Sequence, residues 1–360
     1  MSQVLVTGAT GFIGSHLVES LVRRGDRVRC LVRPNSLCGP LQSMGVELVR
    51  GELGRPGDLR AAVADVDVVF HLAGSICALR RDDLFRVNRD GTEQVARACA
   101  AQSNPPTLVV VSSVAAAGPT SRLGCRLESD PPAPVSNYGA SKRAGELAAW
   151  RFAHAVPTTI VRPGIVFGPR DRESLPIFRA VATFRLHLVP GLASPPLSYI
   201  YVLDLVTLLL QAAARGQRLR SHPDEPNGGG IYFATHSEHP SYAQWGQLIA
   251  RASGVGRIVV FPLAQPMPWL VAAATELVNR CRGRNYQLNI DKMRDALVES
   301  WACSGDKAHR ELGFAPGDSL AAQFAATAAW YRAAGWLTPG QPAPPARVPL
   351  TDSARRRNSA

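Results

Sequence analysis

The chain of 360 residues is too long for one comfortable hydrophobic core, so its length predicts two linked cores. Hydrophobic residues make up 46% of the chain and charged residues 19%, which is typical of a globular protein and excludes a disordered or fibrous one. The net charge is +12, but the arginines are scattered singly, which indicates a solvated basic surface rather than a nucleic-acid site.

Neither the cysteines nor the N-terminal residues indicate export. The seven cysteines are odd in number and form no Cys-x-x-Cys pair, which favours reduced thiols over a disulfide framework or a metal site. An apolar run starts at Gln3 without a signal-peptide pattern before it, so we expect a cytoplasmic protein.

Short valine-rich runs alternate with amphipathic stretches through the first half of the chain. The predicted strands are 4–7, 28–32, 47–49, 66–72, 108–112 and 159–162, and the predicted helices are 15–24, 59–64, 92–102 and 141–153. Apolar strands joined by helical crossovers predict an α/β fold with a doubly wound parallel sheet of the Rossmann type, covered on both faces.

The second half is looser and predicts a smaller, mostly C-terminal α/β domain that binds the substrate. We assign 1–166 to the dinucleotide-binding domain, with 198–235 returning to it, and 167–197 and 236–337 to the substrate domain. Strand-like runs occupy 197–202 and 231–235, and helical patterns occupy 242–253, 288–299 and 319–334. Residues 338–360, rich in Pro, Ala, Arg and Ser, predict a disordered tail.

The stretch 258–275 carries no charge over eighteen residues. Its three prolines exclude one continuous membrane-spanning helix, although 269–274 is typical of the start of an apolar helix. Burial under the substrate domain is the simpler interpretation, and peripheral contact with a membrane is the alternative.

A glycine-rich loop separates the first predicted strand from the first predicted helix. Glycines allow the tight turn and the close approach of a pyrophosphate, and the amino end of the helix offers unpaired N–H groups. We therefore predict a dinucleotide-binding loop whose contacts are Gly8, Thr10, Gly11, Phe12, Ile13 and Gly14.

The end of the second predicted strand bears on the choice between NAD(H) and NADP(H). An acid there would bond the adenine ribose 2′-hydroxyl, but this chain has Val32 followed by Arg33 and no acid. An arginine can hold a 2′-phosphate through two hydrogen bonds, so we favour NADP(H) over NAD(H). The alternative is an exposed loop arginine.

Tyr138 and Lys142 are four residues apart, which puts both on one face of a helix. A free phenol has a pKa near ~10, and a neighbouring ammonium favours its phenolate form. Ser112 and Ser113 end the strand 108–112, at the sheet edge where ligands bind. A serine hydroxyl there can bond a substrate oxygen as charge develops on it, so we expect one serine to be reactive and the other structural.

The sequence resembles the extended short-chain dehydrogenase/reductases, the NAD-dependent epimerase/dehydratase family, over residues 3–337. Seven motifs in the family's order carry the resemblance: 7–14, 71–74, 87–92, 112–118, 138–142, 162–169 and 198–205. The resemblance implies that Ser113 is the catalytic serine, Tyr138 the general acid/base and Lys142 its partner. It also implies that Asn88 holds the lysine's water relay.

Further cofactor contacts follow from the same resemblance. They are Leu72, Ala73 and Gly74 along the adenosine and ribose path, and Pro163, Ile165 and Val166 against the nicotinamide. The family often has Gly-Asp-Leu after the third strand, where this chain has Gly51-Glu52-Leu53, so Glu52 and Leu53 stand at the adenine position. The family also implies a homodimer through two helices per subunit.

Several features favour an apolar substrate. The strand that ends in Arg33 is more similar to the dihydroflavonol-reductase and 3β-hydroxysteroid-dehydrogenase branches than to the sugar epimerases. Sugar dehydratases carry an Asp-Glu pair after the reactive serine, where this chain has Val114-Ala115. We expect an NADP(H)-dependent oxidoreductase that interconverts a secondary alcohol and a ketone on a sterol, a 3-oxoacyl chain or a polyketide. The alternatives are a nucleotide-sugar epimerase with tightly bound NAD and a non-catalytic cofactor-binding regulator.

The remaining polar residues of note receive structural interpretations. We expect His71 to pack and Asp204 to cap a helix. His236 and His239 are three residues apart, but no cysteine or acid cluster accompanies them, so we expect no metal.

Overall fold

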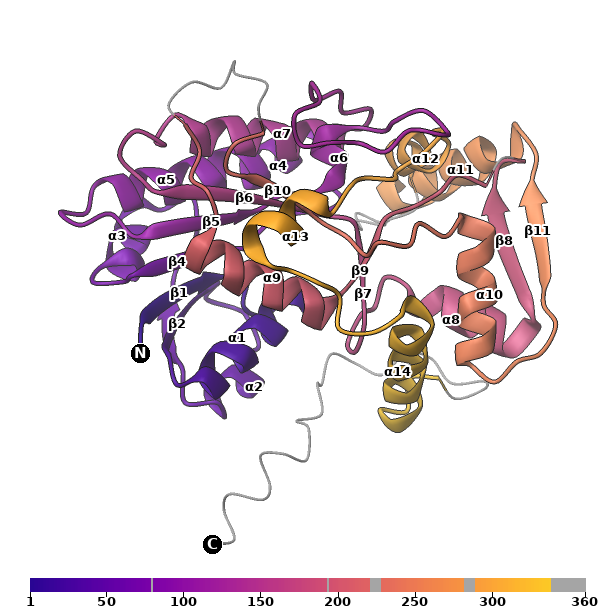
Figure 1. Ribbon diagram of the computed structural model, residues 1–360, viewed down its shortest axis with the longest axis horizontal. Coiled ribbons are helices and arrows are strands. Elements are labelled where there is room, and N and C mark those ends of the chain that lie inside the picture. Colours follow the sequence, from indigo (N-terminus) through magenta and orange to yellow (C-terminus); the bar gives the residue numbers. More distant parts are fainter. Residues whose placement is uncertain (79, 193, 221–227, 282–288, 338–360) are drawn as a thin grey trace, which may run out of the picture.

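The larger part of the molecule is built on a seven-stranded parallel sheet with helices on both of its faces (Figure 1). The computed structural model describes residues 1–78, 80–192, 194–220, 228–281 and 289–337, so the predicted tail 338–360 lies outside the described residues. The strands are β1 (Gln3–Thr7), β2 (Arg27–Val32), β3 (Glu47–Arg50), β4 (Val68–His71), β5 (Thr107–Val111), β6 (Thr158–Pro163) and β10 (Ile231–Ala234). Their order is β10-β6-β5-β4-β1-β2-β3, so β1 lies between β4 and β2, and the predicted doubly wound Rossmann sheet is confirmed.

Helices cover both faces of this sheet. One face packs against α1 (Phe12–Arg24), α9 (Val202–Arg215) and α13 (Asp306–Leu312), and the other against α3 (Pro56–Val63), α5 (Gly91–Ala100) and α7 (Asn137–Trp150). Each face of the sheet has its own hydrophobic core, and alternating residues of β1 pack in one or the other. Val4 and Val6 lie in the core on the α1 side, and Leu5 lies in the core on the α7 side. Shorter turns are α2 (Gly39–Gln42), α4 (Arg81–Phe85), the π-helix η1 (Arg86–Asp90) and α6 (Val114–Ala117).

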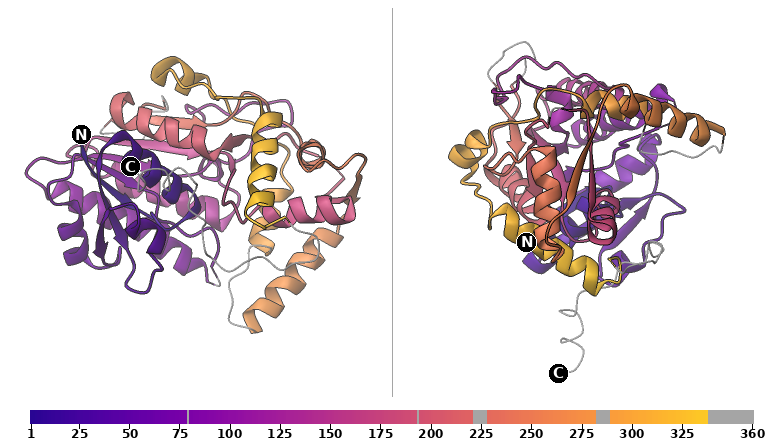
Figure 2. Two further views of the ribbon diagram at one scale, coloured as in Figure 1. Left: turned by 90° about the horizontal axis from the view of Figure 1, so that it is seen from below. Right: turned by 90° about the vertical axis from the view of Figure 1, so that its right-hand side faces the viewer.

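A second, smaller group of elements lies at one end of the sheet (Figures 1 and 2). It contains two two-stranded parallel sheets, β7 (Ile165–Phe167) with β9 (Tyr199–Tyr201), and β8 (Leu186–Pro190) with β11 (Val259–Leu263). Its helices are α8 (Leu175–Phe184), α10 (Tyr242–Ala252), α11 (Met267–Cys281), α12 (Ile290–Ala296) and α14 (Leu320–Ala333). Its core is aromatic, and the rings of Phe167 and Phe324 stack with centroids 4.1 Å apart.

Two segments lie elsewhere than their predicted units. The run 197–202 contributes β9 to a small sheet, because the chain leaves β6 at Gly164 and the amide of Ile165 bonds the Ser198 carbonyl. The second segment contains α13 and lies in the range assigned to the substrate domain. Leu312, the last residue of α13, and Phe314 instead pack in the core that α1 and α9 form on the large sheet. The chain therefore returns to the large sheet once more than expected.

The expected capping role of Asp204 is wrong. Tyr201 is the N-cap residue of α9, and Asp204 lies in the first turn. Its carboxylate accepts the Gly317 amide at 3.1 Å and the Gln323 side-chain amide at 2.6 Å, so it joins α9 to the segment that leads into α14.

Within the described residues, no helix has the length and apolar composition needed to cross a membrane.

Candidate active site

The glycine loop between β1 and α1 has the geometry of an anion cradle. Gly8 has a φ of 75°, and a methyl group there would lie 2.7 Å from the Ala73 nitrogen. A methyl group at Gly14 would collide with the Gly8 carbonyl oxygen. Because Gly11, the N-cap residue of α1, has no side chain to bond the first amides, these N–H groups are available to a phosphate.

A cavity of about 180 Å³ opens beside this loop. Thr10, Gly11 and Phe12 line it together with Arg170 and Arg172, and Arg170 is ion-paired with Glu19 at 2.6 Å. Ile13 is directed toward the core that covers this face of the sheet. The cradle of backbone amides at the start of α1 fits the pyrophosphate of a dinucleotide.

The carboxyl end of β4 is fixed against β1 by His71. Its ring nitrogens bond the Thr7 hydroxyl at 2.8 Å and the Thr92 hydroxyl at 3.1 Å. Burial lowers the pKa of His71 to about 3, so the ring is neutral, and it has the packing role expected for it. The residues that follow, Leu72, Ala73 and Gly74, run along the glycine loop, where the Ala73 amide donates to Thr7 Oγ1 at 3.3 Å.

At the ends of β2 and β3, Arg33 is exposed and Glu52 turns toward Arg55, 4.0 Å away. Leu53 packs against Gly91. No sequence pattern pointed to Asp58, whose carboxylate accepts the Glu52 amide at 3.0 Å and fills the space beside Gly51. Asp58 therefore holds the turn that carries the predicted adenine contacts.

Ser113, Tyr138 and Lys142 come together at the carboxyl edge of the sheet, as their motifs predict. Ser113 is the N-cap residue of α6, where its hydroxyl accepts the Ala115 amide at 3.2 Å, and it lies beside the Tyr138 side chain. Lys142 lies one turn further along α7, and its Nζ donates to the Val111 carbonyl at 2.7 Å. Gly74 faces this lysine, because a methyl group there would lie 3.6 Å from Lys142 Nζ.

The protonation states differ from the expectation that Lys142 lowers the pKa of Tyr138. In this structure burial raises the pKa of Tyr138 to about 12, although the nearby Ser113 hydroxyl opposes this shift. Burial also lowers the pKa of Lys142 to about 8, although the Glu146 carboxylate opposes this shift. The phenol is therefore protonated at neutral pH, which suits proton donation.

Asn88 lies in the π-helix η1 and connects the loop after β4 to α7. Its Nδ2 donates to the Ser75 carbonyl and to Ser141 Oγ, both at 2.8 Å, and its Oδ1 accepts the Ser75 amide at 2.8 Å. The structure thus gives its side chain a positioning role beside Gly74, and its part in a water relay stays a prediction.

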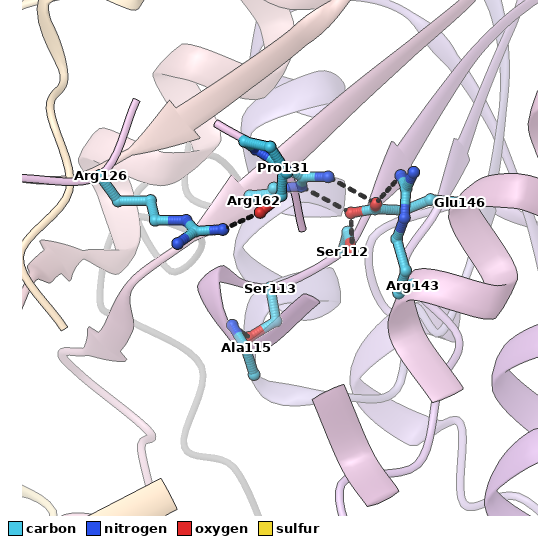
Figure 3. A network of polar contacts seen from close by, with 8 residues as sticks. All are labelled: Ser112, Ser113, Ala115, Arg126, Pro131, Arg143, Glu146 and Arg162. Atoms are coloured by element: carbon cyan, nitrogen blue, oxygen red, sulfur yellow. Dashed lines mark hydrogen bonds and ion pairs between the residues drawn. The ribbon is translucent and has the colours of Figure 1, made fainter. Parts of the chain in front are cut away.

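A buried ionic network behind these residues was not anticipated (Figure 3). Glu146 accepts two hydrogen bonds from the fully buried Arg162, at 2.8 and 2.7 Å, and one from Arg143 at 3.0 Å. The Ser112 hydroxyl donates to it at 2.6 Å. Burial alone would raise the pKa of Glu146, but Arg162 keeps it below its ordinary value. The one feature of the sequence that pointed to Glu146 was its position four residues after Lys142, on the same face of the helix.

The amino end of α7 is held by Asp291, a residue that is distant from it in the sequence. The Asp291 carboxylate of α12 accepts the amides of Asn137 at 2.7 Å and Tyr138 at 3.1 Å. Inside the same turn, Ser136 Oγ accepts the Gly139 amide at 3.0 Å. No sequence signal pointed to Asp291, because 153 residues separate it from Tyr138.

The predicted nicotinamide contacts lie at the same edge. Pro163 ends β6, and Ile165 and Val166 open β7 with their side chains partly exposed. Gly164 between them passes so close to the Ser198 carbonyl that a side chain would not fit. In the part of the chain that the structure describes, no group of three His, Cys, Asp or Glu side chains could hold a metal ion.

Comparison with known proteins places this geometry in a family. The model of the NAD dependent epimerase/dehydratase family matches residues 4–224. The chain is 31% identical to the ceramide reductase of Caulobacter vibrioides over 93% of this chain and 96% of that protein. It is 28% identical to sterol demethylase protein B of Methylococcus capsulatus, over 92% of this chain and 99% of that protein.

Solved structures agree with the fold. The crystal structure of gox2253 superposes with a TM-score of 0.75 at 25% identity, over 94% of this chain and all of that one. MoeE5 in complex with UDP-glucuronic acid and NAD gives 0.69 at 25% identity, over 92% of this chain and 99% of that one. The glycine cradle, the Ser113–Tyr138–Lys142 cluster and these matches agree: the chain belongs to the NAD-dependent epimerase/dehydratase family of extended short-chain dehydrogenase/reductases and is a nucleotide-dependent oxidoreductase.

Proposed function

We propose that this protein is an NADP(H)-dependent oxidoreductase that interconverts a secondary alcohol and a ketone on an apolar, chain-bearing substrate. The observation that carries the proposal is the convergence of Ser113, Tyr138 and Lys142 at one edge of the sheet, where Lys142 Nζ donates to the Val111 carbonyl at 2.7 Å and lies opposite Gly74. These groups lie at the sheet edge beside the glycine loop, where a dinucleotide and a substrate meet in this architecture.

In the reductive direction the phenol is the acid. The substrate carbonyl oxygen accepts hydrogen bonds from Ser113 and Tyr138, which stabilise the negative charge that develops on it. A nicotinamide held against Pro163, Ile165 and Val166 would supply the hydride in this direction and accept it in the other. Tyr138 gives its proton to the oxygen, and the Lys142 ammonium stabilises the phenolate until solvent returns the proton.

The substrate pocket supports an apolar ligand. A cavity of about 370 Å³ lies between the ends of β8, β11 and α12, in the segments proposed as the substrate domain. Its lining carries no charged side chain and consists of Pro190, Gly191, Leu192, Pro195, Ala264, Gln265, Ala296, Leu297 and Val298. The relatives named for ceramide and sterol substrates support the same class.

The cofactor preference rests on charge at the end of β2. Arg33 is exposed there, and the end of β3 beside it carries Arg50, whose guanidinium donates to the Pro34 carbonyl at 2.7 Å and holds the Arg33–Pro34 turn. A 2′-phosphate at this corner would be bound by Arg33, and no acid follows β2 to repel it. A homodimer through two helices per subunit remains the expected assembly.

Cofactor titration tests the proposal. We expect tryptophan quenching to show NADPH bound at least about tenfold tighter than NADH, since a phosphate–arginine pair is worth about 1.5–3 kcal/mol. Arg33→Gln should remove most of this preference, whereas Arg60→Gln, an exposed arginine on α3, should leave it unchanged. NAD⁺ that copurifies and survives gel filtration would contradict the NADP assignment and favour the epimerase alternative.

A further inference from the structure

The two-stranded sheet of β8 and β11 has one buried face and one exposed apolar face. His187 and Val189 of β8 are buried, and His187 stacks on Tyr242 of α10. On the opposite face, Leu188 lies beside Phe261 in register, and their exposed fractions are 48% and 52%. Val259 is also on this face and is 60% exposed, so the sheet presents apolar side chains to solvent.

The helix α11 that follows this sheet turns an apolar stripe outward. Met267, Leu270, Val271, Leu277 and Val278 follow helical spacing and are each 41% to 65% exposed. Ala272, on the other side of the helix, is fully buried. The simpler expectation that this segment is buried under the substrate domain is therefore wrong, because only one side of the helix, with Pro268, the half-buried Trp269 and Ala272, packs inward.

These two surfaces lie together at the end of the molecule away from the seven-stranded sheet (Figures 1 and 2). Arginines dominate the charge around them. The sequence contains no acid between residues 174 and 203 or between 239 and 275, and the charged residues of these segments are four arginines. Glu276 of α11 is partly buried and accepts the Ile290 amide at 3.2 Å, so it is turned toward α12. Arg185 and Arg257 are exposed at the amino ends of β8 and β11, where the Val259 amide bonds the Arg185 carbonyl at 2.8 Å.

We propose that the exposed sides of β8, β11 and α11, here called the apolar face, bind the surface of a bilayer that contains anionic lipids. The apolar side chains enter the interface between headgroups and acyl chains, and the arginines at its border pair with lipid phosphates. The protein thereby lies on the membrane and does not cross it.

Charge favours a bilayer over a second copy of the chain. In a symmetric dimer the same patch meets itself, so Arg185 and Arg257 at its border would meet arginines, while Glu276 of α11 is turned toward the Ile290 amide. Anionic headgroups supply the missing negative charge. The substrate cavity opens at the carboxyl ends of the same strands, since Pro190 and Ala264 line it. An apolar chain in a docked protein would thus reach the cavity from the lipid side.

Vesicle flotation of the full chain tests the inference. We expect the protein to float with vesicles of phosphatidylcholine and phosphatidylglycerol and to bind pure phosphatidylcholine at least about tenfold less, with added salt weakening the difference. Phe261→Asp and Leu270→Asp should each reduce flotation at least about tenfold. Leu123→Asp, at a leucine 99% exposed elsewhere, is the matched control and should float normally.

A second pair of variants separates charge from apolar contact. Arg185→Gln with Arg257→Gln should abolish the preference for anionic vesicles, whereas Arg60→Gln should keep it. Protein that fails to float with anionic vesicles would overturn the inference. A dimer in light scattering that Phe261→Asp converts to a monomer, without flotation of the wild type, would instead assign this face to a second copy. Flotation needs no turnover, so Ser113→Ala should float as the wild type, and failure of the proposed reaction would leave this test intact.

Discussion

Ser112 and Ser113 are neighbours in the chain with different partners. Ser112 is buried and donates to Glu146, whereas the Ser113 hydroxyl accepts the Ala115 amide and lies beside Tyr138 at the open edge of the sheet. This difference follows from the end of β5, where successive side chains point to opposite faces. One serine therefore completes a buried network, and the other faces the reacting groups.

Alanine at each serine should separate these roles. Ser113→Ala should lower kcat by about 10²-fold or more with little change in stability, because a donor to the developing oxyanion is lost. Ser112→Ala should cost about 1–3 kcal/mol of stability, because it leaves a buried carboxylate one hydrogen bond short. Steady-state kinetics and urea unfolding of both variants measure these effects. The reverse pattern would show that Ser112 is the reactive serine.

Motif spacing identified the residues whose partners are near in sequence or belong to an ordered set of motifs. Ser113, Tyr138 and Lys142 were predicted together and lie together. Asp58 and Asp291 were missed because each accepts hydrogen bonds from backbone amides. Almost every residue has such an amide, so these contacts produce no recognisable residue pattern in the sequence. The raised pKa of Tyr138 was also missed, since spacing reports which charges are near but not how deeply a group is buried.

At the scale of elements, α12 acts as a cap for α7. Asp291 satisfies two of the amides that the first turn of α7 leaves unpaired, and one of them belongs to Tyr138 itself. The smaller group of elements thus fixes the start of the helix that carries the proposed acid.

Removal of this cap should affect both stability and turnover. We expect Asp291→Ala to cost about 0.5–2 kcal/mol of stability and to lower kcat, because the Tyr138 backbone loses its anchor. Ser319→Ala removes an N-cap of the same kind from α14, far from Tyr138, and should cost similar stability without lowering kcat. Equal kcat values in the two variants would show that Asp291 only stabilises the fold.

The main-sheet strands were predicted to within a residue or two because their valine-rich runs are local signals. The place of β9 was not predictable in this way, since pairing with β7 depends on where the chain leaves β6. The exposure of α11 was misjudged for a physical reason. An apolar stripe has the same spacing whether it faces a protein core or the outside.

The whole molecule should lose stability in mild acid because two histidines are buried in the neutral form. Burial lowers the pKa of His16 to about 4 and of His71 to about 3, below the ordinary value of 6.5. The unfolded chain binds these protons first, so their stabilising contribution is complete above pH 6.5 and falls as the pH drops toward the folded values. The expected loss is about 1.4 kcal/mol per pH unit for each histidine.

Urea unfolding between pH 7 and pH 4 measures this slope. His71→Asn should reduce this dependence of the unfolding free energy on pH by the contribution of one histidine. The variant should also be less stable than the wild type at pH 7. His154→Asn, at an exposed histidine, should leave the slope unchanged. An identical slope in His71→Asn and the wild type would show that His71 takes up its proton without unfolding.

The route of the chain has a consequence for protein engineering. After β6 the backbone passes to the small sheets, returns for α9 and β10, leaves again for α10 to α12, returns for α13 and leaves for α14. The two halves are therefore interleaved, and no single cut separates them. A chimaera that takes its specificity from a relative would have to exchange three separate stretches at once and preserve the contacts of Asp204 and Asp291, which join these stretches to the large sheet.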